Sequence, residues 1–371
     1  MIKKQDIKNV ILTVAMLLST AMAWAEATPD RISFQVQTLT AGETGTQYIT
    51  VVVIGSRIYS AMNFDMKLPE GIEPVFNSKG KIVAKGVESG ILPNEDGDFY
   101  HTITCNYTEE DRNLRISCAS LDNDEFWANS GALFKVPFTV PTFSKPGTLQ
   151  IEMSGLNLTT AAGTKYEPAN ETNTNISIGT EAKAQLSISG TNKWSTAILP
   201  FATELPAGVK AYTCTEKDDD AQVFYLTEAT TMEPYTPYIL WSDNDYSGTL
   251  TGEVDATQYP ESGTVKVGNL TGAVKQQTTN EGYILQNKGG VVKFYVVDPT
   301  KTYTIPAGKC WATPTGNEPD SYSFDIKTTA VTKVAEKGEK TTGACYGING
   351  LQITEPVKGS LYIQSGRKYV R

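Results

Sequence analysis

Short runs in which apolar and polar residues alternate make up most of the chain after residue 30. Each run is bounded by Gly, Pro, Asn or Asp, and this alternation with period two is typical of half-buried strands. Within residues 32–160 the runs are ISFQVQTLT, QYITVVVIG, SAMNFDMKLPEGI, GDFYHTITCNY, LRISCASLD, GALFKVPFTVP and GTLQIEMSGLNLTT. Beyond the N-terminal region, no long stretch carries apolar residues at helical spacing. The pattern predicts an all-β protein.

A polar stretch, ANETNTN at residues 169–175, interrupts the strand pattern. Polar segments of this kind usually lie on a surface between folded parts. We therefore expect a β-domain over residues 30–178, a second, smaller β-domain over residues 184–327, and a short C-terminal β-segment over residues 340–371. The chain of 371 residues is long enough for two domains with separate cores.

Two groups of residues in the first domain carry a family resemblance. Phe64 is followed by Pro69 and then by Ile72, and a later stretch reads GALFKVPF over residues 131–138. These spacings resemble the cohesin family and its carbohydrate-binding-module relatives. The resemblance implies a jelly-roll β-sandwich that binds a macromolecule, since cohesins bind dockerin modules through one sheet face and the related modules bind polysaccharide. The family's calcium, dockerin and sugar contacts are not carried over, because only scaffold positions match.

The second domain and the C-terminus resemble parts of exported Bacteroidetes proteins. The second domain contains WSTAILPF, LPAGVKAY and IPAGKCW, which are similar to a β-module found near the C-termini of surface proteins in that phylum. The final residues, YGINGLQITEPVKGSLYIQSGRKYVR, are similar to its sorting-type C-terminal segments. A terminal β-hairpin that completes the preceding domain fits these residues equally well.

The first 25 residues have the order of a signal peptide. Lys3, Lys4 and Lys8 precede an apolar stretch, and small residues before Glu26 suit a signal peptidase. The apolar stretch, VILTVAMLL, is shorter than the roughly 20 residues that span a bilayer. We therefore expect an exported protein, secreted or at the outer cell surface, that does not span the membrane.

Charge narrows the range of partners. The formal net charge is −9, and removal of three lysines and one aspartate with the first 25 residues makes it −11. An acidic surface argues against nucleic acid and anionic membranes as partners. A glycan or an extracellular protein remains.

The five cysteines include no CxxC pair, so a zinc site is not indicated. A hairpin turning through residues 110–113 would set Cys105 opposite Cys118 on neighbouring strands. Export permits a disulfide between the two, and two buried free thiols fit the pattern as well.

Catalytic and metal-binding patterns are weak. The one histidine, His101, follows the apolar side of a strand, where a structural role is favoured over a catalytic one. Asp243-Asn244-Asp245-Tyr246-Ser247-Gly248 resembles the start of a calcium loop, but position 12 of that loop is Val254 instead of an acid. A hairpin turn is favoured there. We expect no enzyme, no cofactor and no metal site.

Aromatic residues near loops are the remaining lead, because sugar rings stack on flat aromatic faces. The candidates are Trp127, Tyr100, Trp241 and Tyr246. Trp127 is the best of them, since it lies in the polar stretch DNDEFWANSG beside carboxylates and amides. The alternative is that Phe126 and Trp127 plug one end of the sandwich. The sequence thus predicts a non-catalytic exported protein that binds a glycan or protein, or else a structural adhesin or spacer without a small-molecule ligand.

Overall fold

The computed structural model describes residues 30–35, 38–168, 174–316, 319–327, 345–347, 352–353, 358, 361–364 and 367–370. These residues form strands joined by turns, one short 3₁₀-helix, η1 (Ala256–Gln258), and no α-helix. The prediction of an all-β protein is confirmed. The described residues also contain no helix long and apolar enough to cross a membrane.

The chain divides into two compact units. The first runs to Leu186 and also includes Leu199–Thr203 and Ser247–Glu261. The second contains Ser187–Ile198, Glu204–Tyr246 and the residues from Ser262 onward. Separate folding of residues 30–178 and 184–327 stays a prediction.

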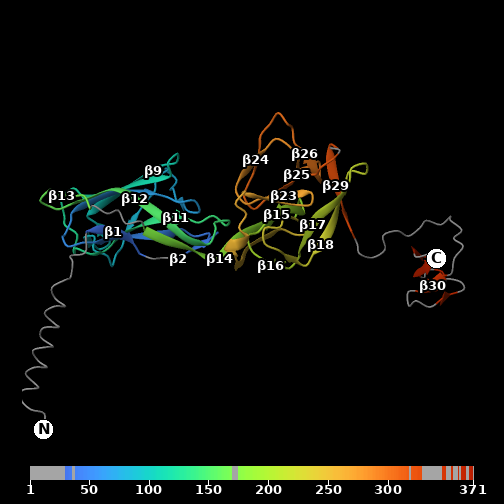
Figure 1. The fold of residues 1–371 in the computed structure, drawn as a ribbon, viewed down its shortest axis with the longest axis horizontal. Helices are drawn as coiled ribbons and strands as arrows, with labels where there is room; N and C mark the ends of the chain where they lie inside the picture. The colour runs from blue at the N-terminus through green and yellow to red at the C-terminus, as the bar shows by residue number, and fades with distance from the viewer. Residues whose placement is uncertain are drawn as a thin grey trace, which may run out of the picture. The chain divides into compact units, whose positions relative to one another are not determined.

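Two main sheets form the first unit (Figure 1). One sheet has the order β1-β3-β11, with β5 and β6 also paired to β11. Its strands are β1 (Arg31–Phe34), β3 (Gln47–Ile54), β11 (Gly131–Thr139), β5 (Glu73–Pro74) and β6 (Lys85–Gly86). The other has the order β2-β14-β12-β4-β10-β9, with β13 on β12 and β21 on β14. Its strands are β2 (Thr38–Ala41), β14 (Thr174–Ile188), β12 (Gly147–Thr159), β4 (Ala61–Lys67), β10 (Asn113–Ser120), β9 (His101–Thr108), β13 (Lys165–Tyr166) and β21 (Tyr246–Glu253). A small hairpin joins β7 (Asn94–Glu95) to β8 (Asp98–Phe99).

Alternation along the strands builds the core of this unit. In β3, Ile49, Val51 and Val53 are buried and their neighbours are partly exposed, as period two requires. In β11 the register shifts between Ala132 and Phe134, and the consecutive residues Leu133 and Phe134 are both buried. A β-bulge of this kind inserts one residue and re-aims the side chains around it.

The run ISFQVQTLT, expected as one strand, divides between the two sheets. Its first part lies in β1, which pairs antiparallel with β3. Its last part lies in β2, which pairs parallel with β14. Both β1 and β2 bury one face, so apolar and polar residues alternate through the whole run. The sequence pattern therefore does not show that the chain passes from one sheet to the other.

The hairpin between β9 and β10 turns one residue earlier than expected. Thr108 pairs with Asn113, so the loop is residues 109–112. Arg112 has φ +51, and its guanidinium donates to the carbonyls of Leu68, Pro69 and Ile72 and to the Glu73 carboxylate. These long-range bonds hold Arg112 in the loop and thereby set the register of the hairpin.

The second unit contains a ten-stranded sheet in the order β15-β20-β17-β18-β29-β26-β25-β28-β23-β22. These strands are β15 (Trp194–Ala197), β20 (Tyr238–Ser242), β17 (Val209–Asp218), β18 (Val223–Ala229), β29 (Ser321–Ile326), β26 (Val291–Val296), β25 (Tyr283–Lys288), β28 (Cys310–Ala312), β23 (Leu270–Ala273) and β22 (Thr264–Val267). Two short pairs join β16 (Thr203–Glu204) to β19 (Thr231–Met232) and β24 (Gln277–Thr279) to β27 (Tyr303–Ile305). At the C-terminus, β31 (Gln352–Ile353), β30 (Cys345–Gly347), β32 (Leu361–Gln364) and β33 (Arg367–Val370) form a four-stranded sheet in that order.

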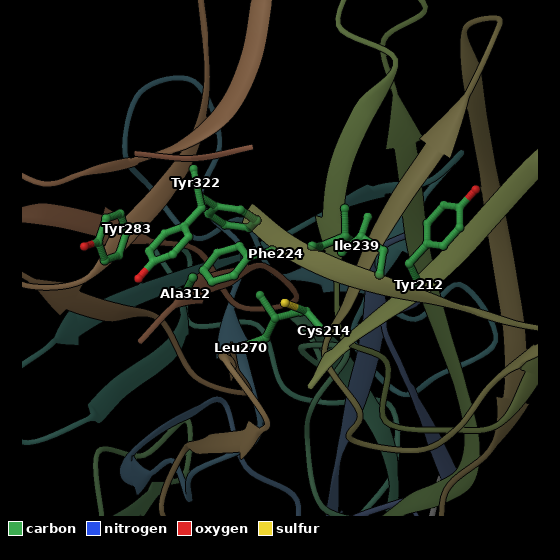
Figure 2. Close-up of a cluster of buried hydrophobic side chains, with 10 residues drawn as sticks. Tyr212, Cys214, Phe224, Ile239, Leu270, Tyr283, Ala312 and Tyr322 are labelled. Atoms are coloured by element: carbon green, nitrogen blue, oxygen red, sulfur yellow. The ribbon is translucent and has the colours of Figure 1, made fainter. Parts of the chain in front are cut away.

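Aromatic side chains dominate the core of the second unit (Figure 2). The rings of Phe224 and Tyr322 are stacked, with centroids 4.0 Å apart and an interplanar angle of 10°. Tyr283 meets Tyr322 edge to face at 5.0 Å, and Phe294 meets Phe224 at 5.7 Å. Offset-stacked and edge-to-face pairs add to the stabilisation that comes from burying the rings.

Candidate functional site

Trp127 and Tyr100 are both exposed, and one short segment of the first unit anchors them. The exposed fractions are 58% for Trp127 and 47% for Tyr100. The Trp127 backbone N–H donates to the Ile91 carbonyl at 2.8 Å, and the Tyr100 N–H donates to the Pro93 carbonyl at 3.0 Å. Leu92, between the two acceptors, is fully buried. The buried segment thus carries two exposed rings that the sequence offered as separate candidates.

Phe126 and Trp127 have opposite environments although they are adjacent. Phe126 is buried, its N–H donates to the Tyr59 carbonyl at 2.7 Å, and its ring lies 5.2 Å from that of His101. Phe126 is therefore packed inside the first unit beside His101. Trp127 projects from a backbone that Phe126 and the Ile91 carbonyl hold in place.

Carboxylates accompany the exposed ring of Tyr100. The Tyr100 hydroxyl donates to Glu95 at 3.2 Å, and this hydrogen bond raises the pKa of Tyr100. Asp124 accepts a hydrogen bond from the Ser120 hydroxyl. Asn123 is fixed on both sides, since its amide oxygen accepts from Ser60 and its amide nitrogen donates to the Ala161 carbonyl. Flat rings beside fixed polar groups are what a sugar-binding edge requires. We call Tyr100 and Trp127, with Glu95 and Asp124, the aromatic edge.

Trp241 and Tyr246 belong to the second unit and not to the aromatic edge. Trp241 lies near the end of β20, opposite Trp194 and Lys210 and one residue before the connection to β21 begins after Ser242. Its ring is partly buried against the aromatic core of the second unit. Tyr246 begins β21 and is also partly buried. Trp241 is less exposed than a stacking platform requires because its ring packs against this core.

The two candidate disulfide residues are not opposite each other. Cys105 pairs with Ile116, and Cys118 pairs with Ile103, because the hairpin loop starts one residue earlier than the sequence suggested. Both cysteines carry free thiols in the structure. Burial raises the pKa of Cys105 to about 11 and that of Cys118 to about 12.

His101 is buried at the start of β9, where its Nε2 lies 3.0 Å from the Ser60 carbonyl. Burial lowers its pKa. The imidazole is therefore engaged with the backbone.

The first half of the calcium-like stretch, residues 243–245, connects β20 to β21, and residues 246–248 lie in β21. Its carboxylates bind protein groups: Asp243 pairs with Lys193 at 2.7 Å, and Asp245 accepts from the Gly190 N–H at 2.7 Å. No cluster of three potential metal-ligating residues occurs in the described ranges.

Two hollows follow strand β9, and sequence reasoning missed both. One, of about 880 Å³, is lined by residues that include Lys85, Phe99, His101 and Lys135. The other, of about 440 Å³, lies between residues 103–107 and a loop that carries Phe76 and Val83. The loop sequence VFNSKGKIVAKG has no regular alternation of apolar and polar residues. The sequence therefore does not predict that its apolar residues are exposed.

No protein-family model matches the chain, and no curated protein matches it. Among solved structures it is similar to the type I cohesin–dockerin complex Coh-OlpA-Doc918 of Clostridium thermocellum, at 13% identity, TM-score 0.31, and coverage of 40% of this chain and 99% of that chain. It is also similar to a type II cohesin domain from the cellulosome of Acetivibrio cellulolyticus, at 16% identity, TM-score 0.29, and coverage of 40% and 95%. A non-cellulosomal cohesin from Archaeoglobus fulgidus gives 14% identity, TM-score 0.29, and coverage of 40% and 91%.

Proposed function

We propose that this protein is a non-catalytic, exported protein that binds a polysaccharide through the aromatic edge of its first β-sandwich. The observation that carries the proposal is the common anchoring of Trp127 and Tyr100 on residues 91–93. An aromatic ring stabilises the fold most when it is fully buried. A ring that stays about half exposed therefore forgoes part of that stabilisation. A ligand that stacks on the rings would recover that contribution.

The polar groups at the edge suit a sugar. A pyranose has an apolar face of C–H groups and a rim of hydroxyls. Glu95 already accepts from Tyr100, and a second lone pair on the carboxylate can accept from a sugar hydroxyl. Binding sites of this type join an apolar platform to a few convergent polar groups.

A glycan array with the full chain tests the proposal. We expect binding to a restricted set of polysaccharides, with Trp127→Ala removing it and Trp127→Tyr retaining part of it because a flat ring remains. Val291→Ala, at a similarly exposed position of the second unit, is the matched control and should bind as the parent does. Equal binding by the parent and Trp127→Ala would reject the aromatic edge as the site.

A protein partner is the second candidate, and the outward face of β12, β4, β10 and β9 favours it. The face carries short polar side chains, among them Asn63, Ser117 and Thr104, around an Arg115–Asp65 ion pair of 2.7 Å. A sheet face with short polar side chains and no exposed aromatic ring among them suits a protein better than a sugar. If binding to a candidate protein falls with Arg115→Glu and not with Trp127→Ala, this face is the site. A chain that binds neither class would act as a spacer or adhesin component.

Export rests on the N-terminal sequence pattern and is tested separately. N-terminal sequencing of the cell-made protein should find Glu26 or Trp24 first. An intact Met1 on the mature protein would contradict export by this route.

A further inference from the structure

Strand β9 is the outer strand of its sheet in the described part of the chain. It pairs with β10 on one side, through eight consecutive residue pairs from His101 to Thr108. Every second residue of such a strand points its backbone N–H and C=O away from the sheet. Natural outer strands are usually protected by charges, Pro, a bulge or short length. The β9 sequence HTITCNYT contains no Lys, Arg, Asp, Glu or Pro, and its pairing with β10 has no register shift.

The smaller hollow lies along this outer side. Its lining includes five consecutive β9 residues, 103–107. Side chains of consecutive strand residues point to opposite faces, so a hollow lined by all five follows the edge of the strand instead of one face. Five residues of strand span about 13 Å, which is the length of a five-residue extended peptide.

The other wall of the hollow carries three apolar side chains beside Lys81 and Gly80. Phe76 and Val83 are each 49% exposed, and Ile82 between them and Tyr107 on β9 line the same space. The rings of Phe76 and Tyr107 lie 6.1 Å apart, edge to face. An extended peptide on β9 would place every second side chain against this wall.

The wall is held in shape by its own turn. The Asn77 side-chain oxygen accepts from the N–H groups of Lys79 and Lys81, at 2.9 and 3.0 Å. The Asn77 N–H donates to the Lys81 carbonyl, and the Gly80 N–H donates to the Asn77 carbonyl. Gly80 has φ +69, which glycine adopts without strain. A preformed wall lowers the ordering cost of binding.

Charge indicates what kind of peptide fits. Residues 75–87, VFNSKGKIVAKGV, contain three lysines and no acid, in a protein of net charge −9. Lys79, Lys81 and Lys85 are exposed and form no ion pair with a described carboxylate. Lys81 lines the smaller hollow, and Lys85 of the same loop lines the larger one. The positive charge of this loop favours a partner with carboxylates beside its apolar residues.

We propose that the edge of β9 binds an extended peptide of another protein by strand addition, with alternate apolar side chains in the hollow and flanking carboxylates near Lys79, Lys81 and Lys85. Main-chain hydrogen bonds to β9 would supply affinity, and the hollow would select the side chains. The aromatic edge is a different set of residues, so this inference stands apart from the polysaccharide proposal.

A synthetic peptide tests the inference on the full chain. The probe is fluorescein-labelled, capped Glu-Val-Thr-Ile-Thr-Val-Glu, measured by fluorescence anisotropy. We expect saturable binding below about 1 mM. The same peptide N-methylated at alternate residues keeps its side chains and loses its outward N–H donors, so it should not bind. A peptide with Lys in place of both Glu residues should bind at least about tenfold more weakly at low salt.

Two pairs of matched variants locate the site. Val83→Ser should weaken binding about tenfold, and Val291→Ser, which changes an equally exposed valine of the second unit, should leave it unchanged. Lys81→Glu should weaken binding in a salt-dependent way, and Lys165→Glu, at another exposed lysine, should not. Circular dichroism and the melting temperature confirm that the variants fold.

Three results would overturn the inference: no probe binding up to about 1 mM, equal binding of the N-methylated peptide, or equal loss in the Val291→Ser control. Sedimentation velocity distinguishes a second copy of the chain as the occupant. A concentration-dependent dimer that Val83→Ser dissociates, with no peptide binding to the monomer, would replace the foreign peptide by self-association.

Discussion

The two units place aromatic side chains in opposite environments. In the second unit, Phe224, Phe294 and Tyr322 are fully buried, and the ring of Phe224 contacts the rings of the other two. In the first unit, Trp127 and Tyr100 expose about half of their surface. The buried rings lie on strands, where alternation turns every second side chain inward. The exposed rings lie on connections that hydrogen bonds fix individually. The number of aromatic residues in a unit therefore does not show whether a ring belongs to the core or to the surface. The position of the ring, on a strand or on a connection, does.

The strongest test of this comparison is Phe224→Ala. Phe224 is fully buried and stacked on Tyr322, so the substitution should lower the free energy of unfolding by about 3–5 kcal/mol. Urea denaturation followed by circular dichroism measures the change. Val296→Ala, at an exposed position of the same unit, is the control and should change it by less than about 1 kcal/mol. Equal effects of the two substitutions would show that the second unit lacks this packed core.

A polar network in the first unit should give the next largest effect. Asp30 accepts hydrogen bonds from the Tyr59 hydroxyl, from the Ser56 N–H and hydroxyl, and from the Arg57 guanidinium. Burial raises the pKa of Asp30, but these bonds outweigh burial and the pKa is lowered from 3.8. Asp30→Asn should cost about 1–3 kcal/mol at neutral pH, because hydrogen bonds to a charged group are lost or weakened.

The pH dependence follows from the direction of this shift. An aspartate with a lowered folded pKa stabilises the fold above the unfolded pKa of 3.8, and the stabilisation is lost as the pH falls through the folded pKa. The difference in unfolding free energy between the parent and Asp30→Asn should therefore be constant at neutral pH and shrink below 3.8. A difference that grows towards acid would contradict the assigned role of the carboxylate.

Local pattern was sufficient for most of the strands, and it offered Trp127 and Tyr100 as candidates near loops, with packing of Trp127 beside Phe126 as the alternative. Alternation in stretches such as QYITVVVIG reports directly on one buried face. The polar neighbours of Trp127 indicated a connection, and the structure places it in one. These features depend on residues close in sequence.

Features set by distant residues could not be predicted in this way. The register of the β9–β10 hairpin depends on Arg112, whose hydrogen-bond acceptors lie about 40 residues away in sequence. The partial burial of Trp241 depends on the aromatic core of the second unit, whose residues come from distant strands. The hollow beside β9 depends on a loop with no periodicity. None of these contacts leaves a pattern within a short window of sequence.

Trp127→Ala tests the other half of the comparison, the exposed ring of the first unit. Because the ring is 58% exposed, its removal should change the free energy of unfolding by less than about 1 kcal/mol. Phe126→Ala, one residue away and buried, should cost about 3–5 kcal/mol. Thermal denaturation of both variants measures the two changes in stability. Similar losses for the two residues would mean that Trp127 packs into the end of the sandwich as Phe126 does.

The smallest expected effect is that of a reducing agent. A disulfide between Cys105 and Cys118 would close a short loop and stabilise the fold by roughly 3 kcal/mol. The observed register sets each cysteine opposite an isoleucine instead, and both carry free thiols. Burial, which raises the pKa of both thiols to about 11 or 12, also keeps them protonated and slow to oxidise near pH 8. Tris(2-carboxyethyl)phosphine should therefore leave the melting temperature unchanged, and thiol titration of the unreduced, unfolded protein should find both thiols. A fall in melting temperature on reduction that Cys105→Ser abolishes would establish the disulfide and reject this register.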